Sequence, residues 1–431
     1  MSTPVQKDKR VLSKVALRLL PFLFLLYIVN YLDRINIGFA ALAMNRDIGL
    51  TATSFGLANA IFYVGYVACE VPSNLLMVRF GARSWLSRIM ITWGLASACT
   101  MFVVGAATLY GVRFFVGVLE AGFVPGVLVY LSHWFPKGYR ARANGLLMTA
   151  QPVAMAVGAG ISGLVMDGAH GWLGLQGWRW LFLLEGVPAI LLGLTAYFYL
   201  TDHPKDATWL SLEERQELTR LLEAGRLIGA VQRSTWSQVF DARVILLALA
   251  YFCLVNSLSA NSTWIPTIVS TLVTFHSFSY VNLISAIPPG FALVAMPLWA
   301  LNSDRTGERR WHIVVAMALT AVGWLLVVVA VAPWVRLLGL VLTTSGAFCA
   351  MSTFWTLPQS ILSEEARPAG IGFISAVGLC GSAFSPAVIG YLRDLTGTFS
   401  AGLVYAAFLL IIGIALILVA CRINAQKSAG T

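Results

Sequence analysis

Long apolar runs are the feature that most limits how this chain can fold. A helix of about twenty apolar residues crosses the roughly 30 Å hydrocarbon core of a bilayer. Six such runs precede a polar stretch at 201–241, and six more follow it. The sequence therefore predicts an all-α membrane protein with 12 transmembrane helices in two six-helix halves. The predicted spans are 15–42, 54–77, 85–105, 107–133, 143–166, 179–200, 243–271, 278–301, 312–331, 334–358, 367–392 and 399–421.

Composition excludes the other broad classes. The chain is 58% hydrophobic and only 11% charged, whereas a soluble domain carries about 25% charged residues. Strands of a membrane barrel alternate polar and apolar residues in segments of about ten, and these runs are longer and continuous. The first run is long and lacks a small-residue cleavage site, so we expect it to remain as an anchor.

The distribution of basic residues predicts the orientation. Of the 29 Lys and Arg residues, 23 fall on the side that holds both termini and the linker. Four fall on the other side, and two lie inside spans. Because basic residues are enriched in cytoplasmic loops, we expect both termini and the linker to be cytoplasmic. This also accounts for the net charge of +10 without nucleic acid as a partner.

The sequence gives no indication of an enzyme, a metal site or a cofactor. The six cysteines lie in apolar runs with no CxxC pair, so we interpret them as packing residues rather than disulfides or ligands. The five histidines fall near span ends or in loops. No phosphate-binding loop is present, so transport driven by ATP is not expected.

An internal repeat supports two equivalent halves. "VRFGARSW" (78–85) follows the second span, and "DRTGERRW" (304–311) follows the eighth. The shared positions are Arg79, Gly81 and Arg83 in the first turn and Arg305, Gly307 and Arg309 in the second, where Asp304 precedes them. Parallel repeats of six helices are one way to build a transporter; the alternative is two unrelated basic turns. We expect these residues to form gating contacts at the cytoplasmic side.

The same pattern divides the chain into an N-terminal half (1–200), a linker (201–241) and a C-terminal half (242–431). Within the linker, "SLEER" places a Ser three residues before a Glu, which is a capping-box pattern. We expect a short amphipathic surface helix at about 211–225 that acts as a strut between the halves.

With these turns and this layout, the chain resembles the major facilitator superfamily over nearly its whole length. The stretches "YLDRINIGFAAL", "EVPSNL", "GARSWLSRIMITWG", "RFFVGVLEAGFVPG", "GWRWLFLLEGVP", "HPKDATWLSLEE" and "FWTLP" resemble its anion:cation symporter family, in the hydroxyphenylacetate, phthalate and tartrate permease branch. The resemblance implies uptake of organic acids, with arginines of spans 1 and 4 binding carboxylate and acids of the same spans carrying protons.

Two positions depart from the family pattern. Val78 stands where the turn usually has Asp, so the gating ion pairs are expected to be asymmetric. In span 11, Ser375 and Leu379 occupy places that hold two Asn in many carriers of polyhydroxy acids. A pocket with fewer amides suits a substrate with fewer hydroxyl groups.

Charged residues inside spans are the strongest functional candidates, since such groups face a cavity or one another. The sequence indicates five, namely Asp33, Arg34, Glu70, Arg113 and Glu120. Arg113 and Glu120 are seven residues apart, on nearly the same helix face and about 10 Å apart along the axis. We expect Gly117 between them to leave room for a ligand. The alternative is that Arg113 snorkels to the membrane edge.

Asp33 and Arg34 are adjacent, so their side chains point about 100° apart and do not simply pair. Arg34 can bind an anion with its forked guanidinium, and Asp33 can titrate beside it. Together with Arg113 and Glu120 they sum to zero when both acids are ionised, and to a charge of +2 when both are protonated. Proton and anion would then favour each other's binding. A salt-bridge lattice between spans 1 and 4 is the structural alternative.

Other polar and aromatic residues are candidates for the pocket lining, and ordinary packing or interfacial anchoring is the alternative for each. Besides the two arginines, we expect substrate contacts from Asn36, Tyr63, Tyr66, Gln151, Trp355 and Ser375. Glu70, which precedes Pro72, is interpreted as a structural hydrogen-bonding acid, and the alternative is that it carries a proton.

These observations predict a proton-coupled symporter that imports an organic carboxylate, with an aromatic or small hydroxy- or dicarboxylic acid favoured. The alternatives are a symporter for sugar acids and an exporter of drugs or organic acids. A drug exporter needs no arginine pair in its cavity, which weighs against the last. A membrane sensor would need a cytoplasmic output domain, and only a short tail follows residue 421. We expect a monomer among lipids of a bacterial inner membrane.

Overall fold

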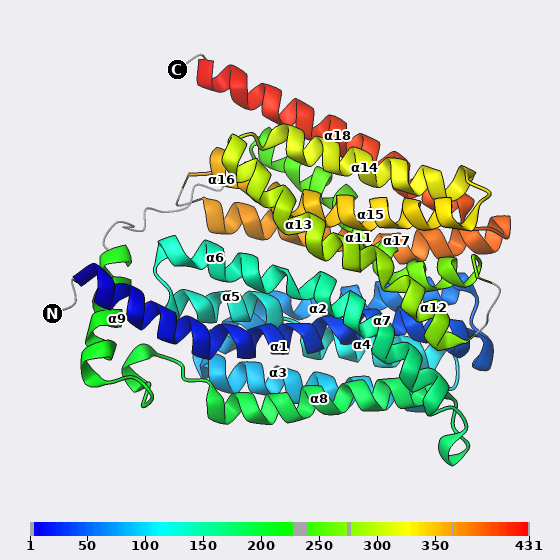
Figure 1. Cartoon of the computed structure of the whole chain (residues 1–431), viewed down its shortest axis with the longest axis horizontal. Coiled ribbons are helices and arrows are strands. Elements are labelled where there is room, and N and C mark those ends of the chain that lie inside the picture. The colour runs from blue at the N-terminus through cyan, green and yellow to red at the C-terminus, as the bar shows by residue number, and fades with distance from the viewer. Residues whose placement is uncertain (1–3, 227–238, 274–276, 364–365, 430–431) are drawn as a thin grey trace.

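The computed structural model describes residues 4–226, 239–273, 277–363 and 366–429, and these are almost entirely helical (Figure 1). Eleven helical stretches in the described residues are long and apolar enough to cross a membrane. The third predicted span forms a shorter helix, α3, continued by the 3-10 turn η1.

The N-terminal elements are α1 (Pro4–Asp47), α2 (Ala52–Phe80), α3 (Ala82–Ala98), η1 (Cys99–Phe102), α4 (Ala106–Glu120), α5 (Phe123–Trp134), α6 (Lys137–Met148), α7 (Ala150–Gly168), η2 (Trp172–Gly174) and α8 (Gly177–Tyr199). The remaining elements are η3 (Pro204–Asp206), α9 (Leu212–Arg226), α11 (Ala242–Ser270), α12 (Phe278–Ser285), α13 (Ile287–Thr306), α14 (Arg310–Val329), α15 (Pro333–Phe354), α16 (Thr356–Ile361), α17 (Arg367–Thr396) and α18 (Ser400–Ala429).

The helices form two bundles that lie side by side (Figure 1). One bundle holds α1 to α8, and the other holds α11 to α18. Both chain ends and α9 lie at the same end of the molecule. We call this end the linker face and the opposite end, where α1 ends and α2 begins, the far face.

Four of the predicted continuous spans are in fact broken. The spans expected at 107–133, 143–166, 278–301 and 334–358 each consist of two helices separated by one or two residues. In the last three, the backbone between the helices keeps right-handed helical angles, at Thr149, Ala286 and Trp355. The break in the first follows Glu120, where Ala121 is extended and Gly122 has a φ of 86°. Since a left-handed residue there favours glycine, the Glu-Ala-Gly order places Glu120 at the last position of α4.

The two halves approach most closely near the far face. A Cβ on Gly56 of α2 would overlap the carbonyl oxygen of Pro386 in α17. A Cβ on Gly38 of α1 would lie 2.7 Å from the carbonyl oxygen of Ser262 in α11. Backbones can come this close only where a side chain is missing, so these glycines let the halves close against each other at this end.

Two aspartates fasten the halves at the far face. Asp167, at the end of α7, accepts hydrogen bonds from Ser277 Oγ (2.7 Å), Phe278 N (3.2 Å) and Ser279 N (2.7 Å) at the start of α12. A carboxylate at a helix N-terminus satisfies free amides and the helix dipole. This contact therefore joins the N-terminal half to the C-terminal half.

The second fastening is the counterpart of the first in the repeat. Asp394, near the end of α17, accepts hydrogen bonds from Ala52 N (3.2 Å), Thr53 N (2.7 Å) and Thr53 Oγ1 (2.6 Å) at the start of α2. The helices α7 and α17 end the fifth and eleventh spans, and α2 and α12 begin the second and eighth. We call the two contacts the aspartate caps.

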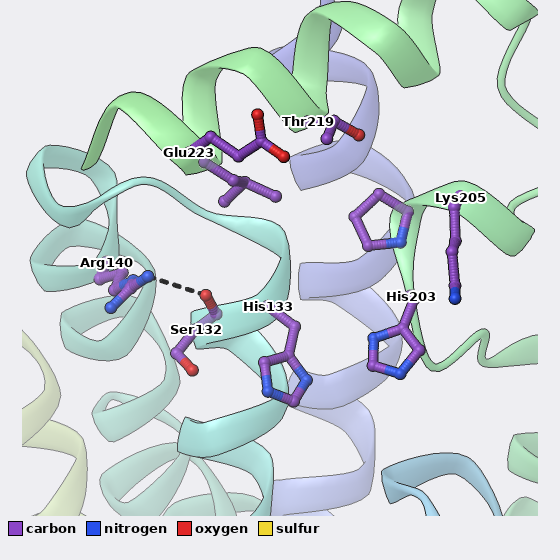
Figure 2. A pocket seen from close by; sticks show the side chains of 9 residues that line it. Ser132, His133, Arg140, His203, Lys205, Thr219 and Glu223 are labelled. Carbon is purple, nitrogen blue, oxygen red and sulfur yellow. Dashed lines mark hydrogen bonds between the residues drawn. The ribbon is translucent and has the colours of Figure 1, made fainter. Parts of the chain in front are cut away.

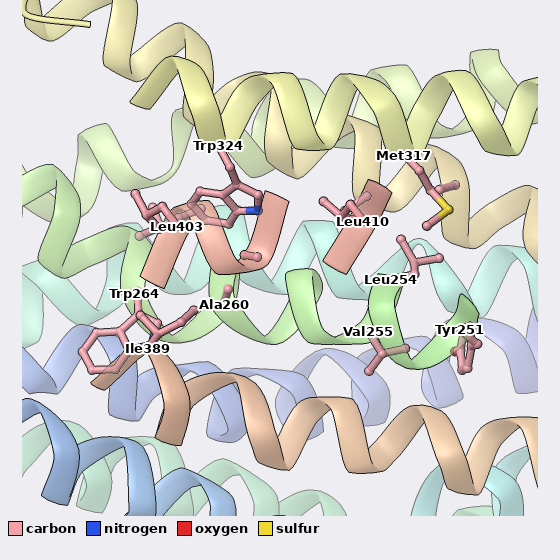
Figure 3. Packing of buried hydrophobic residues seen from close by; sticks show 14 of the residues in the cluster. Tyr251, Leu254, Val255, Ala260, Trp264, Met317, Trp324, Ile389, Leu403 and Leu410 are labelled. Atoms are coloured by element: carbon pink, nitrogen blue, oxygen red, sulfur yellow. The ribbon is translucent and has the colours of Figure 1, made fainter. Parts of the chain in front are cut away.

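Buried charge is confined to one half. Among the described residues, the buried charged side chains are Asp33, Arg113, Glu120 and Glu185, all in the N-terminal bundle. The C-terminal bundle has an apolar and aromatic core (Figure 3) that also buries neutral polar residues such as Asn256 and Asn261. Within it, Trp324 donates its indole N–H to Ser257 Oγ at 2.8 Å. The ionic chemistry of the interior therefore belongs to α1, α4 and α8.

The two repeated turns differ, as the loss of Asp at position 78 predicts. In the second turn, Arg309 pairs with Asp304 at 2.6 Å, and Gly307 ends α13 with a φ of 68°. In the first turn the carboxylate comes from Asp202, which accepts a hydrogen bond from Arg83 N at 2.8 Å.

The remaining residues of these turns lie at the linker face. The guanidinium of Arg79 lies 5.6 Å from the ring of Phe80. A Cβ on Gly81 would lie 2.8 Å from Asp202 Oδ2, so the first turn is closed against the segment that follows α8. Arg305 is exposed in the last turn of α13.

The polar linker contains a helix, α9, that lies at the linker face. Helix α9 begins after Ser211, whose Oγ accepts from Glu214 N at 3.2 Å while Glu214 Oε2 accepts from Ser211 N at 2.9 Å. This is the reciprocal capping box that the sequence indicates. Glu214 also pairs with Lys14 of α1 at 2.6 Å, so α9 is tied to the N-terminal half.

Candidate functional site

The central feature of the site is a buried ion pair between α1 and α4. Arg34 Nε lies 2.5 Å from Glu120 Oε1, and Glu120 has no exposed surface. Asn30, one turn earlier on α1, donates to the same oxygen at 2.8 Å. The Arg34 guanidinium also lies 4.7 Å from the ring centroid of Tyr66. Arg34 is thus neutralised by a carboxylate in this conformation.

Asp33 faces different neighbours, as expected for adjacent residues of a helix. Its Oδ1 accepts a hydrogen bond from Ser97 Oγ of α3 and lies 3.5 Å from Asn36 Nδ2. Asn36, expected to contact substrate, is buried beside Asp33 rather than beside Arg34. The positive charge that acts on Asp33 is that of Arg113. Asp33 and Arg34 therefore each have a counter-charge in α4.

Arg113 lies in the interior, with 3% of its surface exposed. The snorkelling alternative is therefore wrong. Its guanidinium lies 4.6 Å from the ring centroid of Phe62 in α2, a cation–π arrangement. The expectation that Gly117 leaves room for a ligand is also wrong, because a Cβ there would overlap the Phe62 carbonyl oxygen. Gly117 instead permits close packing of α4 on α2.

The predicted lining residues fall into two groups. Tyr66 is buried and Tyr63 half-buried, both on α2 beside the two arginines. Gln151 of α7 donates to Tyr27 Oη at 2.7 Å, which connects it to α1. In the other half, Trp355 is half-buried 4.8 Å from the Tyr251 ring. Ser375 is half-buried on α17.

Several residues that contact the charge cluster carry no signal in the sequence that marks them as site residues. Asn30, Tyr27 and Phe62 are neutral, and only their helical spacing from Arg34 and Tyr66 connects them with the charged positions. Glu185 is a further acid in an apolar run, and its closeness to the start of the predicted span at 179–200 indicates a position near a helix end. Helix α8 begins at Gly177, so Glu185 lies eight residues inside it and is buried.

A separate cavity of about 260 Å³ lies at the linker face (Figure 2). Its lining residues are Ser132, His133, Arg140, His203, Pro204, Lys205, Thr219, Leu222 and Glu223. Arg140 donates to the carbonyl oxygens of Ser132 (2.8 Å) and Phe135 (2.7 Å) at the end of α5. His133 and His203 thus lie away from the charge cluster, as the sequence predicts. In the described part of the chain, no group of three or more His, Cys, Asp or Glu is arranged to hold a metal.

Relatives match almost the entire chain. A protein of Agrobacterium vitis named "Putative tartrate transporter" is 44% identical, covering 98% of this chain and 97% of its own length. The "Putative metabolite transport protein NicT" of Pseudomonas putida is 38% identical, with 94% and 93% covered. The "Quinolone resistance transporter" of Acinetobacter baumannii is 34% identical, with 98% and 97% covered.

Solved structures agree on the fold. A crystal structure titled as a bacterial homologue of the human lysosomal transporter Spinster superposes with a TM-score of 0.74 at 17% identity, covering 94% of this chain and 96% of that one. The family model described as "Major Facilitator Superfamily" matches residues 23–364 and 268–429. The chain is a transporter, not an enzyme, with the two-bundle fold described above, and it belongs to the Major Facilitator Superfamily.

Proposed function

We propose that this protein imports an organic carboxylate together with protons across a bacterial inner membrane. The observation that carries the proposal is the buried Arg34–Glu120 pair at 2.5 Å. While Glu120 is ionised, it occupies the guanidinium that an incoming carboxylate would need. Protonation of Glu120 removes that competition and leaves a cation free to bind the anion, so proton and substrate favour each other.

The two arginines suit a small dicarboxylate. The guanidinium carbons of Arg34 and Arg113 both lie within 5.8 Å of the Phe62 ring centroid. One guanidinium can then serve each end of a four-carbon diacid. The relatives named for tartrate support this choice within the predicted class of small hydroxy- and dicarboxylic acids. Tyr66, Tyr63 and Gln151 would contact the substrate from the N-terminal half, and Trp355 and Ser375 from the other.

Alternating access follows from the arrangement of the halves. We infer that the linker face is cytoplasmic, because 23 of the 29 basic residues lie on that side. The aspartate caps then close the extracytoplasmic end. Rocking of the halves about the central site would open that end. We expect the protein to complete this transport cycle as a monomer.

Energetically, import of an anion against an inside-negative potential needs protons. Each net elementary charge gains or loses about 2.3 kcal/mol per 100 mV. A dianion must therefore enter with more than two protons for the potential to drive net uptake.

The central test compares wild type with Glu120→Gln in liposomes. In the variant we expect pH-driven accumulation of tartrate to be lost while exchange at equal pH is kept, since the arginine is permanently available. Accumulation that survives the substitution would show that Glu120 is not an essential proton carrier.

Substrate class is tested by thermal stabilisation of the purified protein with tartrate, phthalate, hydroxyphenylacetate and galactonate at acidic and neutral pH. Stabilisation by tartrate that grows at acidic pH supports the proposal. A response to galactonate would favour a sugar-acid symporter. A response only to lipophilic cations or quinolones would favour export, the function that the name of one relative suggests.

A further inference from the structure

Glu185 is a buried acid to which the proposed cycle assigns no task. It lies in α8 with 8% of its surface exposed. Ser162 Oγ of α7 donates to Glu185 Oε1 at 3.2 Å, and Oε2 is buried with no hydrogen-bond partner. A carboxyl group held this deeply needs a counter-charge or a proton.

The neighbours of Glu185 supply no cation. From α1, Asn36 and Asp33 face it, and Asp33 is the charged group that acts on it. Helix α3 places Gly94 against Gly186, and the charged residues of that helix lie in its first seven residues, toward the linker face. Helix α7 contributes one acid, Asp167, and its carboxylate accepts a hydrogen bond from the start of α12. Glu185 therefore faces an acid, not a base.

Asn36 connects the two acids. It lies less than one turn after Asp33 on α1, its Nδ2 is 3.5 Å from Asp33 Oδ1, and its amide also contacts the Glu185 carboxyl. The second oxygen of Asp33 and that of Glu185 are both buried without a partner. Each acid therefore has one oxygen held by neutral donors and one available to carry a proton.

Charge balance assigns a proton to this pair. The cluster holds two cations, the partly exposed Arg34 and the buried Arg113, and three buried carboxyl groups, Asp33, Glu120 and Glu185. With all three ionised, the interior carries an uncompensated negative charge, which is costly at this depth. One bound proton restores neutrality, and Glu185 is the acid without an arginine beside it.

The different depths of Glu185 and Asp33 below the far face indicate the direction in which a proton would pass between them. Glu185 lies eight residues from the far-face end of α8, or about 12 Å, whereas Asp33 lies fourteen residues from the end of α1, or about 21 Å. We propose that Glu185 receives the proton from the extracytoplasmic side and passes it to Asp33 during each cycle. The O–H bond at Glu185 breaks as one forms at Asp33, so the negative charge moves outward as the proton moves inward. This inference rests on the proposed proton coupling.

The test uses full-length wild type, Glu185→Gln and Glu185→Asp in liposomes, with labelled tartrate as the probe. Two rates are measured, accumulation driven by an inward proton gradient and exchange at equal pH. Glu185→Gln is expected to lower gradient-driven accumulation at least about tenfold while exchange is retained. Glu185→Asp keeps a carboxyl group and is expected to restore accumulation with a shifted pH profile.

Two failures are distinguishable. If wild type exchanges tartrate but shows no gradient-driven accumulation, the proton coupling itself is absent and both proposals fall. If wild type accumulates tartrate and Glu185→Gln does so with the same pH profile, only the role of Glu185 is overturned. Should Glu185→Gln not reach the membrane, Ser162→Ala, which removes only the donor, replaces it. Its pH midpoint is expected to move, and an unchanged midpoint overturns the inference.

Discussion

Asp394 accepts hydrogen bonds from the amide and the hydroxyl of Thr53, at 2.7 and 2.6 Å, and thereby fastens the end of α17 to the start of α2 across the two halves. Its repeat counterpart Asp167 fastens α7 to α12 at 2.7 Å. In both cases most donors are backbone amides at a helix start. Opening the far face must break both contacts.

Asp394→Asn and Asp167→Asn should each favour the conformation that is open at the far face. Hydrogen bonds to a charged group contribute about 1.5–3 kcal/mol, and an amide oxygen replaces them only in part. The double variant should approach the sum of the single effects, since the caps share no residue. Spin labels at exposed Leu173 and Val331, on opposite halves, would report the separation in a cysteine-free background.

Asp206→Asn is the matched control, because Asp206 is an exposed acid at the linker face. It should leave the label distances unchanged. Distances that also stay unchanged in the Asp167 and Asp394 double variant would show that the caps do not hold the far face closed.

Arg34→Ala should strongly destabilise the protein at neutral pH, because it leaves Glu120 charged and fully buried. Loss of one partner of a buried pair costs about 3–5 kcal/mol. Adding Glu120→Gln should recover much of this loss, and acidification should do the same for Arg34→Ala by protonating Glu120. Thermal unfolding of the purified variants measures both effects. Additive losses in the double variant would mean that the pair is not coupled.

Gly117→Ala should separate α4 from α2 and lower stability by about 1–3 kcal/mol, the usual cost of overpacking. The control is Gly111→Ala on the same helix, where a Cβ meets nothing within 4 Å. That variant should be neutral or stabilising, since alanine is the better helix former. Melting temperatures in detergent compare the two, and equal shifts would contradict the close packing at Gly117.

Ser211→Ala should weaken the start of α9 by about 1 kcal/mol through loss of its cap.

The pKa of Glu214 is held below its usual value, first by the hydrogen bond from Lys14 and then by that from Ser211 N. A lowered pKa contributes stability that is present above the usual pKa and is lost as the pH falls through the lowered one. The protection of α9 amides against hydrogen exchange, relative to their intrinsic rates, should therefore fall below about pH 4. Lys14→Met should reduce that dependence.

The fold was predictable because the length of each apolar run and the distribution of Lys and Arg between the loops can be read directly from the sequence. Both indicate a twelve-span architecture without any knowledge of packing, and the capping box of Ser211 and Glu214 is readable for the same reason. The breaks within four spans were not predictable. A break such as that after Glu120 depends on backbone angles at Ala121 and Gly122, and glycine in a membrane helix also serves close packing, as Gly117 shows.

The site was predictable where charge marks it. Asp33, Arg34, Arg113 and Glu120 are conspicuous in apolar runs, and helical geometry already separates Asp33 from Arg34. Partner choice required the structure, because it depends on which helices adjoin. Thus Asn36 lies beside Asp33 and Glu185 rather than beside Arg34, and Asn30 shares Glu120 with Arg34.

Helix α1, which carries Asp33 and Arg34, is much longer than a membrane span. It is helical from Pro4 to Asp47, about 65 Å, or roughly twice the thickness of the hydrocarbon core. Asp8 and Lys14, near its start, hold Arg220 and Glu214 of α9. A tilt of about 5° around Asp33 would move the start of α1 by about 4 Å. Any tilt of α1 at the charge cluster would therefore displace the start of α1 against α9 at the linker face, where a reporter group on α9 could follow it.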